Sequence, residues 1–227
     1  MKKSPPKLRF AVLAADTVLC TIRDKRLFVR LIAVNRPPHF RHAWGLPGGL
    51  IHPTETAEEA ARRNLSVKAH IGASTLYMEQ LYTFSAIDRD PRGRVVAVAY
   101  LALIAWDALS PQEQRDTPET RWVPMDAVGA LAYDHNEILK AARKRLRSRA
   151  ASTTILVTIM PDEFTLTELE NAYECIMKTD LDKRNFRKKI LKLKIVRALP
   201  KKRTLGRARP ATLYRFASPD VTEIKIL

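Results

Sequence analysis

Apolar residues dominate four segments of the first half of the chain, and polar turns separate them. Residues 8–22 and 26–35 are rich in Val, Leu and Ile and are joined by a short polar turn, which favours two adjacent strands. Residues 77–86 and 95–106 form a second pair, and the sequence DRDPRGR between them carries Pro and Gly turn signals. The pattern therefore predicts two pairs of strands, the second of them a hairpin.

Helical spacing of apolar residues appears at residues 56–69 and again at residues 134–149. Strands accompanied by two helices predict an α/β sandwich for residues 1–150. The sequence RSRAASTT at residues 147–154 interrupts the apolar pattern and is the best candidate for a domain boundary. We therefore divide the chain into residues 1–150 and residues 151–227.

The second segment has a different pattern of helix and strand signals. Thr165 is followed three residues later by Glu168, which is a capping box at the start of a helix. Another helix is expected from near Asp182, and two short strands around a basic turn are expected after Pro200. Two helices followed by a basic hairpin predict a winged helix-turn-helix. Residues 155–160 (ILVTIM) fit either a strand or a buried helical turn.

Positive charge is concentrated in this second segment. The whole chain has a net charge of +16, and residues 178–215 contain 15 Lys and Arg against two Asp. Such a balance favours an anionic partner, nucleic acid above all. A charge run is often only a solvated face, but apolar residues such as Phe186, Ile190 and Leu213 recur within this one. We therefore expect a folded basic domain.

The remaining composition indicates a reduced protein inside the cell. The two cysteines, Cys20 and Cys175, have no metal-ligand spacing. A membrane span needs about 18 consecutive apolar residues, and no apolar run in the sequence approaches that length. The apolar stretch near the N-terminus is interrupted by Asp16 and preceded by Pro5 and Pro6, so it fits a first strand better than a signal peptide. We expect a cytoplasmic protein with no membrane partner.

One segment, WGLPGGLIHPTETAEEAARRNLSVKAHIG, resembles the Nudix box of pyrophosphate hydrolases. The positions that match are Gly49, Glu55, Arg63, Leu65 and Ile71. The family has three metal-binding glutamates where this chain has Asn64, Val67 and Lys68, and a Gly where it has His70. The three substituted positions share one helix face because they lie three and four residues apart.

The substitutions remove the ligands that a divalent cation needs. Carboxylates on that face would hold metal against a pyrophosphate. Asn is a poor ligand for a hard cation, Val is none, and Lys repels the metal. We therefore expect no catalytic residues, no metal site and no required cofactor. The WGLPGG turn before a helix can still receive an anion.

Further motifs extend the resemblance across residues 8–216. The sequences RPPHFRHAWGLPGG, EQLYTF, DRDPRGRVVAVAYLAL, LAYDHNEIL, FTLTELENAYE, LDKRNFRKKI and RPATLYRF occur in this order. Together they are similar to the Nudix-related transcriptional regulators called NrtR. The resemblance implies an α/β + α+β fold: an N-terminal Nudix-like α/β/α sandwich with a mixed sheet, and a C-terminal winged helix-turn-helix.

The resemblance also implies a function. Members of that family repress genes of NAD metabolism, bind ADP-ribose or a related NAD-derived nucleotide as effector, and bind double-stranded operator DNA as homodimers. We therefore expect a repressor with a catalytically inactive Nudix domain. The sequence does not identify the operator, the effector or the direction of its effect.

Candidate DNA-binding residues follow from helical geometry. With Phe186 and Ile190 facing the core, Arg184 and Lys188 face outward, and their neighbours flank them. Arg can contact guanine edges and Asn can contact adenine, while Lys can contact phosphates without contacting any base. A wing-tip arginine suits phosphates or a narrow minor groove. The candidates are Lys183, Arg184, Asn185, Arg187, Lys188, Arg207 and Arg209.

Candidate effector-binding residues come from the box and the motif before it: Arg36, Arg41, Gly48, Gly49, Glu55, Arg63 and Lys68. Lys68 is a candidate to hold an uncleaved pyrophosphate where a metal would sit, although a solvated helix residue is the simpler interpretation. Glu55 and Arg63 fit a purely structural pair. Arg89 and Arg92 fit residues that only solvate a hairpin, and His135 fits a packing histidine.

Two alternatives remain open at this point. The protein could be an active ADP-ribose pyrophosphatase that uses glutamates outside the box, such as Glu79 or Glu137. It could also be an RNA-associated protein whose basic region has no operator specificity. Metal-dependent release of AMP from ADP-ribose would indicate the enzyme. Equal binding to one duplex site and to random DNA would indicate the RNA-associated protein.

Overall fold

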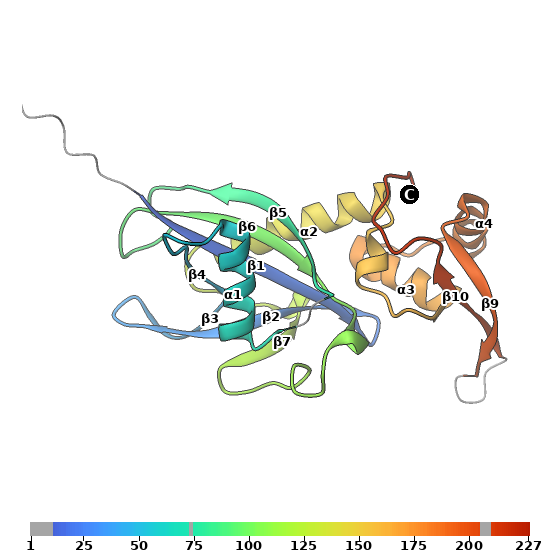
Figure 1. The fold of residues 1–227 in the computed structure, drawn as a ribbon, viewed down its shortest axis with the longest axis horizontal. Coiled ribbons are helices and arrows are strands. Elements are labelled where there is room, and N and C mark those ends of the chain that lie inside the picture. Colours follow the sequence, from blue (N-terminus) through green and yellow to red (C-terminus); the bar gives the residue numbers. More distant parts are fainter. Residues whose placement is uncertain (1–10, 73–74, 205–209) are drawn as a thin grey trace, which may run out of the picture.

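The computed structural model describes residues 11–72, 75–204 and 210–227. A seven-stranded sheet forms the centre of the N-terminal half (Figure 1). Its strands are β1 (Val12–Arg23), β2 (Arg26–Arg36), β3 (Phe40–Gly45), β4 (Gly48–Leu50), β5 (Tyr77–Phe84), β6 (Val95–Leu103) and β7 (Thr120–Pro124). The predicted strands are all present, and the segment DRDPRGR joins β5 and β6 as an antiparallel hairpin.

The sheet is mixed, with strand order β3-β2-β1-β6-β5. β1 and β6 run parallel at its centre, whereas the other pairs are antiparallel. β4 and β7 pair with β1 and β2 outside this path. The expected mixed sheet is therefore confirmed.

Helices cover both faces of the sheet, and this explains why the central strands are apolar at successive positions. Val18 and Cys20 of β1 face the core that contains α2 (His135–Ser152). Leu19, between them, faces the core that contains Leu65 of α1 (Ala57–Ala69). Thr56 and Glu59 form a capping box that begins α1. The N-terminal half is thus an α/β/α sandwich.

The C-terminal half has the expected helix, helix and hairpin. It contains β8 (Phe164–Thr165), α3 (Leu166–Met177), α4 (Lys183–Leu193), β9 (Val196–Arg203) and β10 (Ala211–Phe216). The predicted capping box at Thr165 and Glu168 is present, and Asp182 caps α4. The three strands form a small sheet in the order β8-β10-β9. Residues 155–160, which were ambiguous, begin with a 3-10 turn at Ile155–Thr158.

Two sequence expectations about segment ends differ from the structure. Residues 147–152 belong to α2, so the helix continues through the boundary placed after residue 150. Pro200 lies inside β9 and does not precede it. β9 is an edge strand, where the missing backbone donor of Pro is tolerated. Shorter 3-10 turns complete the fold at Trp106–Ala108 and Met125–Ala127.

The two halves share one continuous apolar core. Leu146 and Ala150 of α2 belong to the same buried cluster as Tyr173 and Ile176 of α3. The C-terminal segment returns to this junction, where Ile226 is fully buried and its N–H bonds to the carbonyl of Ala151.

Polar contacts reinforce the junction. Asp126 accepts hydrogen bonds from Arg26 of β2 and from Lys178 at the end of α3, each at 2.9 Å. These two bonds hold the pKa of Asp126 at about 2.

Among the described residues, no helix is both long and apolar enough to cross a membrane.

Candidate functional site

A cavity of about 630 Å³ opens on the sandwich between the sheet and the helix ends. Its walls come from β1, β2, β4, the end of α1, the β5–β6 hairpin and the start of α2. Four of the predicted effector residues line it: Arg36, Gly48, Gly49 and Lys68. The volume falls within the range of small-molecule sites.

The two glycines allow side chains to approach the backbone of β4 closely. A Cβ on Gly48 would lie 1.9 Å from Oδ1 of Asp16. A Cβ on Gly49 would lie 2.7 Å from Oδ1 of Asn64 and 2.7 Å from Nζ of Lys68. Any larger residue at either position would displace these groups, so the glycines shape this wall of the cavity.

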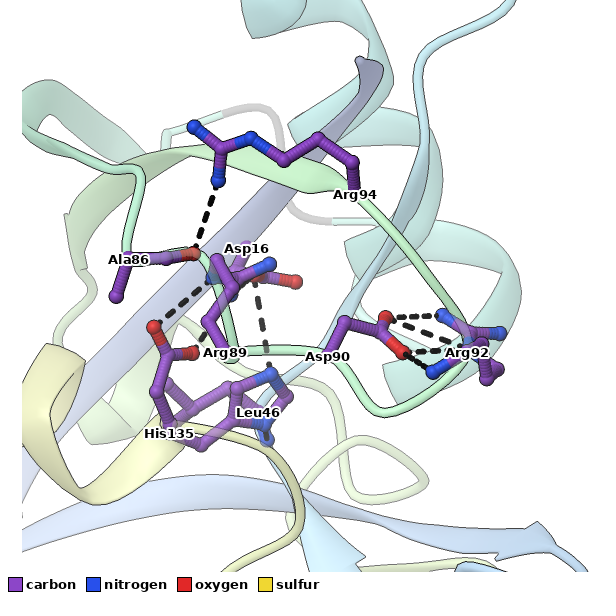
Figure 2. A network of polar contacts seen from close by, with 9 residues as sticks. Asp16, Leu46, Ala86, Arg89, Asp90, Arg92, Arg94 and His135 are labelled. Atoms are coloured by element: carbon purple, nitrogen blue, oxygen red, sulfur yellow. Dashed lines mark hydrogen bonds and ion pairs between the residues drawn. The ribbon is translucent and has the colours of Figure 1, made fainter.

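A buried ion-pair network forms one wall (Figure 2). The guanidinium of Arg89 donates two hydrogen bonds to Asp134, at 2.9 and 2.7 Å, and one to Asp16 at 3.2 Å. Although burial opposes its charge, these carboxylates raise the pKa of Arg89. Arg89 is only 6% exposed, so the expectation that it merely solvates a hairpin is wrong.

His135 connects the same network to the glycine-rich turn. Its Nδ1 accepts a hydrogen bond of 2.9 Å from the backbone N–H of Leu46, and its Nε2 lies 3.7 Å from Asp16. Burial lowers the pKa of His135, although Asp16 opposes the shift. The imidazole is therefore neutral near pH 7, as the packing interpretation of this residue implied.

Positive charge exceeds negative charge around Lys68. Burial, followed by the neighbouring Arg36 and Arg63, lowers the pKa of Lys68. Asp90 also lines the cavity, but Arg92 binds it at 2.7 Å and keeps its pKa low although its side chain is buried. Lys68 itself is half-buried and donates to the carbonyl of Gly48, so it is not a solvated helix residue.

The other three predicted effector residues lie elsewhere. Arg63 binds Glu55 through two hydrogen bonds of 2.9 and 2.7 Å and also donates to the carbonyl of Leu50. These bonds hold the pKa of Glu55 at about 2. The pair thus fixes the turn before α1. Arg41 is exposed on β3. None of these three residues lines the cavity.

Sequence reasoning missed residues that the fold brings to the cavity. Tyr133 contributes an aromatic wall, its ring 4.5 Å from that of Phe40 and 5.3 Å from the guanidinium of Arg92. Its φ of 56° lies in the left-handed region, which few non-glycine residues adopt. Asp16 was detectable in principle, because an acid within an apolar strand needs a buried cation.

The donor set does not fit a divalent cation. Across residues 11–72, 75–204 and 210–227, no group of three or more His, Cys, Asp or Glu could hold a metal ion. The helix face that carries Asn64, Val67 and Lys68 offers one amide, one alkyl group and one ammonium. The acids beside it, Asp16 and Asp90, are held by arginines.

The second candidate site is the exposed face of α4. Lys183, Arg184, Asn185 and Lys188 are exposed, whereas Phe186 and Ile190 are buried against α3, as the helical spacing predicted. Among the ion pairs of the described residues, none involves Arg184 or Lys188. Their side chains are available to an anionic partner.

Arg187 differs from its neighbours on α4. Its guanidinium donates to Thr167 at 2.9 Å and to Glu170 at 3.3 Å, and Glu170 is only 1% exposed. Lys183 approaches the same carboxylate at 3.6 Å. Arg187 therefore stabilises a buried acid between α3 and α4. The predicted wing residues Arg207 and Arg209 lie outside the described residues.

Comparison with known families assigns both halves. Residues 13–145 match the NUDIX domain, and residues 156–216 match the NrtR DNA-binding winged helix domain. A cavity on a Nudix sandwich, joined to a winged helix with an exposed basic face, defines a ligand-responsive transcriptional regulator. The chain belongs to the NrtR family of Nudix-related transcriptional regulators.

A curated relative and a solved structure are similar over almost the full chain. The ADPR responsive transcriptional repressor NtrR of Acinetobacter baylyi is 32% identical over 92% of this chain and 83% of its own length. Shewanella oneidensis NrtR, solved in complex with a 27mer DNA, is 32% identical with a TM-score of 0.79, covering 92% of this chain and 94% of that one.

Two further relatives match the Nudix half. The NUDIX domain of Shewanella oneidensis NrtR, solved in complex with ADP ribose, is 34% identical with a TM-score of 0.53 over 64% of this chain and 94% of that one. The ADP-ribose pyrophosphatase of Methanocaldococcus jannaschii is 31% identical over 44% of this chain and 57% of its own length.

Proposed function

We propose that this regulator is a repressor whose Nudix half binds ADP-ribose, or a related NAD-derived nucleotide, without cleaving it. Nucleotide binding releases the winged helix from operator DNA. The observation that carries the proposal is the cavity, which combines an aromatic wall at Tyr133 with cationic groups at Arg36 and Lys68. A base can stack on the aromatic ring, and the cations suit a diphosphate. Relatives described as ADPR-responsive and as complexed with ADP ribose support this ligand.

Lack of hydrolysis is part of the proposal, and the positions of the remaining glutamates support it. Glu79 lies on β5, 3.3 and 3.4 Å from Arg145 and Arg149. Glu137 is exposed on α2 and pairs with Lys140 at 3.6 Å. Neither glutamate lines the cavity. An enzyme that used these two residues would not have their carboxylates in the cavity where the diphosphate is proposed to bind.

DNA binding is proposed to use the exposed face of α4. Arg184 and Asn185 contact base edges, Lys188 and Lys183 contact phosphates, and Arg207 and Arg209 contact the backbone or the minor groove. Arg187 is not assigned a DNA contact in this proposal; it positions α4 through its hydrogen bond to Glu170. We infer a homodimer, since bacterial operators commonly have two-fold symmetry that matches the protein.

A gel-shift experiment tests the proposal. The DNA is the promoter adjoining the gene for this protein, with excess random duplex, with and without ADP-ribose and Mg²⁺, and the nucleotide is assayed afterwards. We expect a specific shift that intact ADP-ribose reverses. The double variant Arg184→Ala/Lys188→Ala should lose the shift and still bind nucleotide. No specific shift together with AMP release would establish an enzyme, and equal binding to random duplex would refute operator recognition.

A further inference from the structure

Resting on the proposed function, we infer that the cavity binds the nucleotide diphosphate without a divalent cation, and that the ammonium of Lys68 supplies the positive charge. Asn64 is a positioning residue for this ammonium. The positive charge that neutralises the diphosphate then comes from a side chain and not from a metal ion. The effector response of this regulator is therefore expected to be independent of Mg²⁺.

The geometry places Lys68 in the wall of the cavity and Asn64 next to it, beside Gly49. Lys68 and Asn64 lie four residues apart on α1 and so share a face of that helix. Both side chains lie close to Gly49, because a Cβ added to this glycine would lie 2.7 Å from Oδ1 of Asn64 and 2.7 Å from Nζ of Lys68. Gly49 and Lys68 line the cavity, and the carbonyl of Gly48 accepts a hydrogen bond from Lys68. An ammonium has three donors, so further donors of Lys68 are available to a ligand.

The surrounding charges favour an anion over a metal ion. Arg36 and Arg92 line the same cavity as Lys68. Three acids line the cavity: Asp16 is engaged by Arg89 at 3.2 Å, Asp90 by Arg92 at 2.7 Å, and Glu119 is exposed. The four cationic residues of the lining, Arg36, Lys68, Arg89 and Arg92, outnumber them. A divalent cation beside Lys68 would meet net positive charge. A diphosphate would meet the same groups as charge-assisted hydrogen-bond donors.

Asn64 provides a second and independent observation. Its side chain is fully buried, and neither its Nδ2 nor its Oδ1 has a hydrogen-bond partner within the described residues. A buried amide without partners is costly, so it is seldom retained without a function. Its oxygen lies on the side of Gly49 that Lys68 occupies. In the proposed site this oxygen turns to accept a hydrogen bond from the ammonium. Being neutral, it does so without cancelling the charge.

The experiment measures binding of ADP-ribose, and separately of inorganic pyrophosphate, by titration calorimetry in EDTA and in Mg²⁺. The full-length proteins compared are the natural chain, Lys68→Gln, Asn64→Asp and Arg62→Gln. Arg62 is a matched control, because it lies on the same helix, pairs with Glu58 and does not line the cavity. Its substitution removes one positive charge, as Lys68→Gln does.

We expect the natural chain and Arg62→Gln to bind ADP-ribose equally in EDTA and in Mg²⁺. Lys68→Gln should weaken binding by about tenfold or more in both buffers, because a charge-assisted hydrogen bond is lost. Asn64→Asp is nearly isosteric and should also weaken binding in EDTA, since its carboxylate would pair with Lys68 and repel the diphosphate. Because Lys68 is half-buried at the surface of α1, Lys68→Gln tests the inference even if Asn64→Asp does not fold.

Different results separate this inference from the proposed function. Binding of ADP-ribose only in Mg²⁺ would overturn the inference and leave the proposed function standing. Unchanged affinity of Lys68→Gln in EDTA would overturn the role of Lys68. If ADP-ribose does not bind at all, the proposed function fails. In that case, pyrophosphate binding in EDTA that Lys68→Gln abolishes would still support the diphosphate site, and its absence would overturn both.

Discussion

At the scale of single residues, the cavity depends on buried charges that satisfy one another. Arg89 comes from the β5–β6 hairpin, Asp16 from β1 and Asp134 from the residue before α2. The arginine therefore joins three segments that are far apart in sequence. Buried charges of this kind are costly to expose singly, because the remaining partners lose their counter-charge.

Replacing Arg89 by Ala is expected to destabilise the fold by about 3–5 kcal/mol, since Asp16 and Asp134 would remain buried without a cation. The free energy of unfolding in urea measures the effect. Lys144→Ala removes an exposed charge from α2 and should change stability by less than about 0.5 kcal/mol. A similar small change for both variants would show that the network does not stabilise the fold.

The stability of the protein should depend on pH through His135. Burial lowers its folded-state pKa below the ordinary value of about 6.5, so the unfolded chain binds the proton first. Stability is therefore lost as pH falls below about 6.5, by at most about 1.4 kcal/mol for each pH unit. Unfolding free energies at several pH values between 7.5 and 5 check this.

The variant His135→Gln should show a flatter profile over the same range. The carboxylates of Glu55 and Asp126 do not confuse the result, because their folded pKa values are about 2 and their stabilising effect is lost at lower pH. The same slope in His135→Gln and in the natural chain would contradict the assignment of this pH dependence to His135.

At the scale of elements, α4 separates into a face that contacts α3 and a face that is free of it. Phe186 and Ile190 lie on the first, and Arg187 extends it by reaching Glu170. Arg184 and Lys188 lie on the second. The division assigns different effects to substitutions that are otherwise chemically similar.

Substitutions on α4 should therefore differ in kind. Arg184→Ala is expected to cost about 1–3 kcal/mol of specific DNA binding. Lys188→Ala should weaken binding to all sequences and reduce the salt slope by about one. Binding isotherms at several salt concentrations distinguish the two.

Arg187→Ala should instead lower the unfolding free energy by about 1–3 kcal/mol, because it leaves the carboxylate of Glu170 buried with a weaker partner. Urea unfolding of this variant beside Arg184→Ala provides the comparison. If Arg187→Ala alters base preference with unchanged stability, Arg187 contacts DNA directly.

The elements themselves were largely predictable from the sequence. Periodicity located the helix from Thr56, a capping box located the helix from Thr165, and turn signals located the β5–β6 hairpin. The partners of Arg89 and Arg187 were not predictable, because they depend on tertiary contacts. Arg89 and Arg187 looked like surface residues until the fold placed a buried acid beside each. Glu55 and Arg63 form an ion pair with each other. The sequence left open whether they bind the effector or pair, and only the geometry could decide between these roles.

At the scale of the whole molecule, the two halves should unfold together. One buried apolar cluster includes residues of the sheet, of α2 and of the winged helix. Asp126 adds a polar bridge from β2 to the end of α3. A shared core of this kind couples the stability of both halves.

Differential scanning calorimetry should therefore show one transition. ADP-ribose at about 100 times its Kd should stabilise the whole molecule by about 2.7 kcal/mol and shift that transition upward as a unit. GMP serves as a control nucleotide that lacks the diphosphate. Two transitions, of which only one responds to ADP-ribose, would show that the halves unfold independently.

The helix α2 has a mechanical consequence. Its first residue, His135, lines the cavity, and its last turn packs against the winged helix. With 18 residues and a rise of about 1.5 Å each, it is about 27 Å long. A tilt of about 5° at the cavity end displaces the other end by roughly 2 Å over that length. In a two-fold assembly, two such displacements change the spacing between recognition helices, and DNA has a fixed helical repeat.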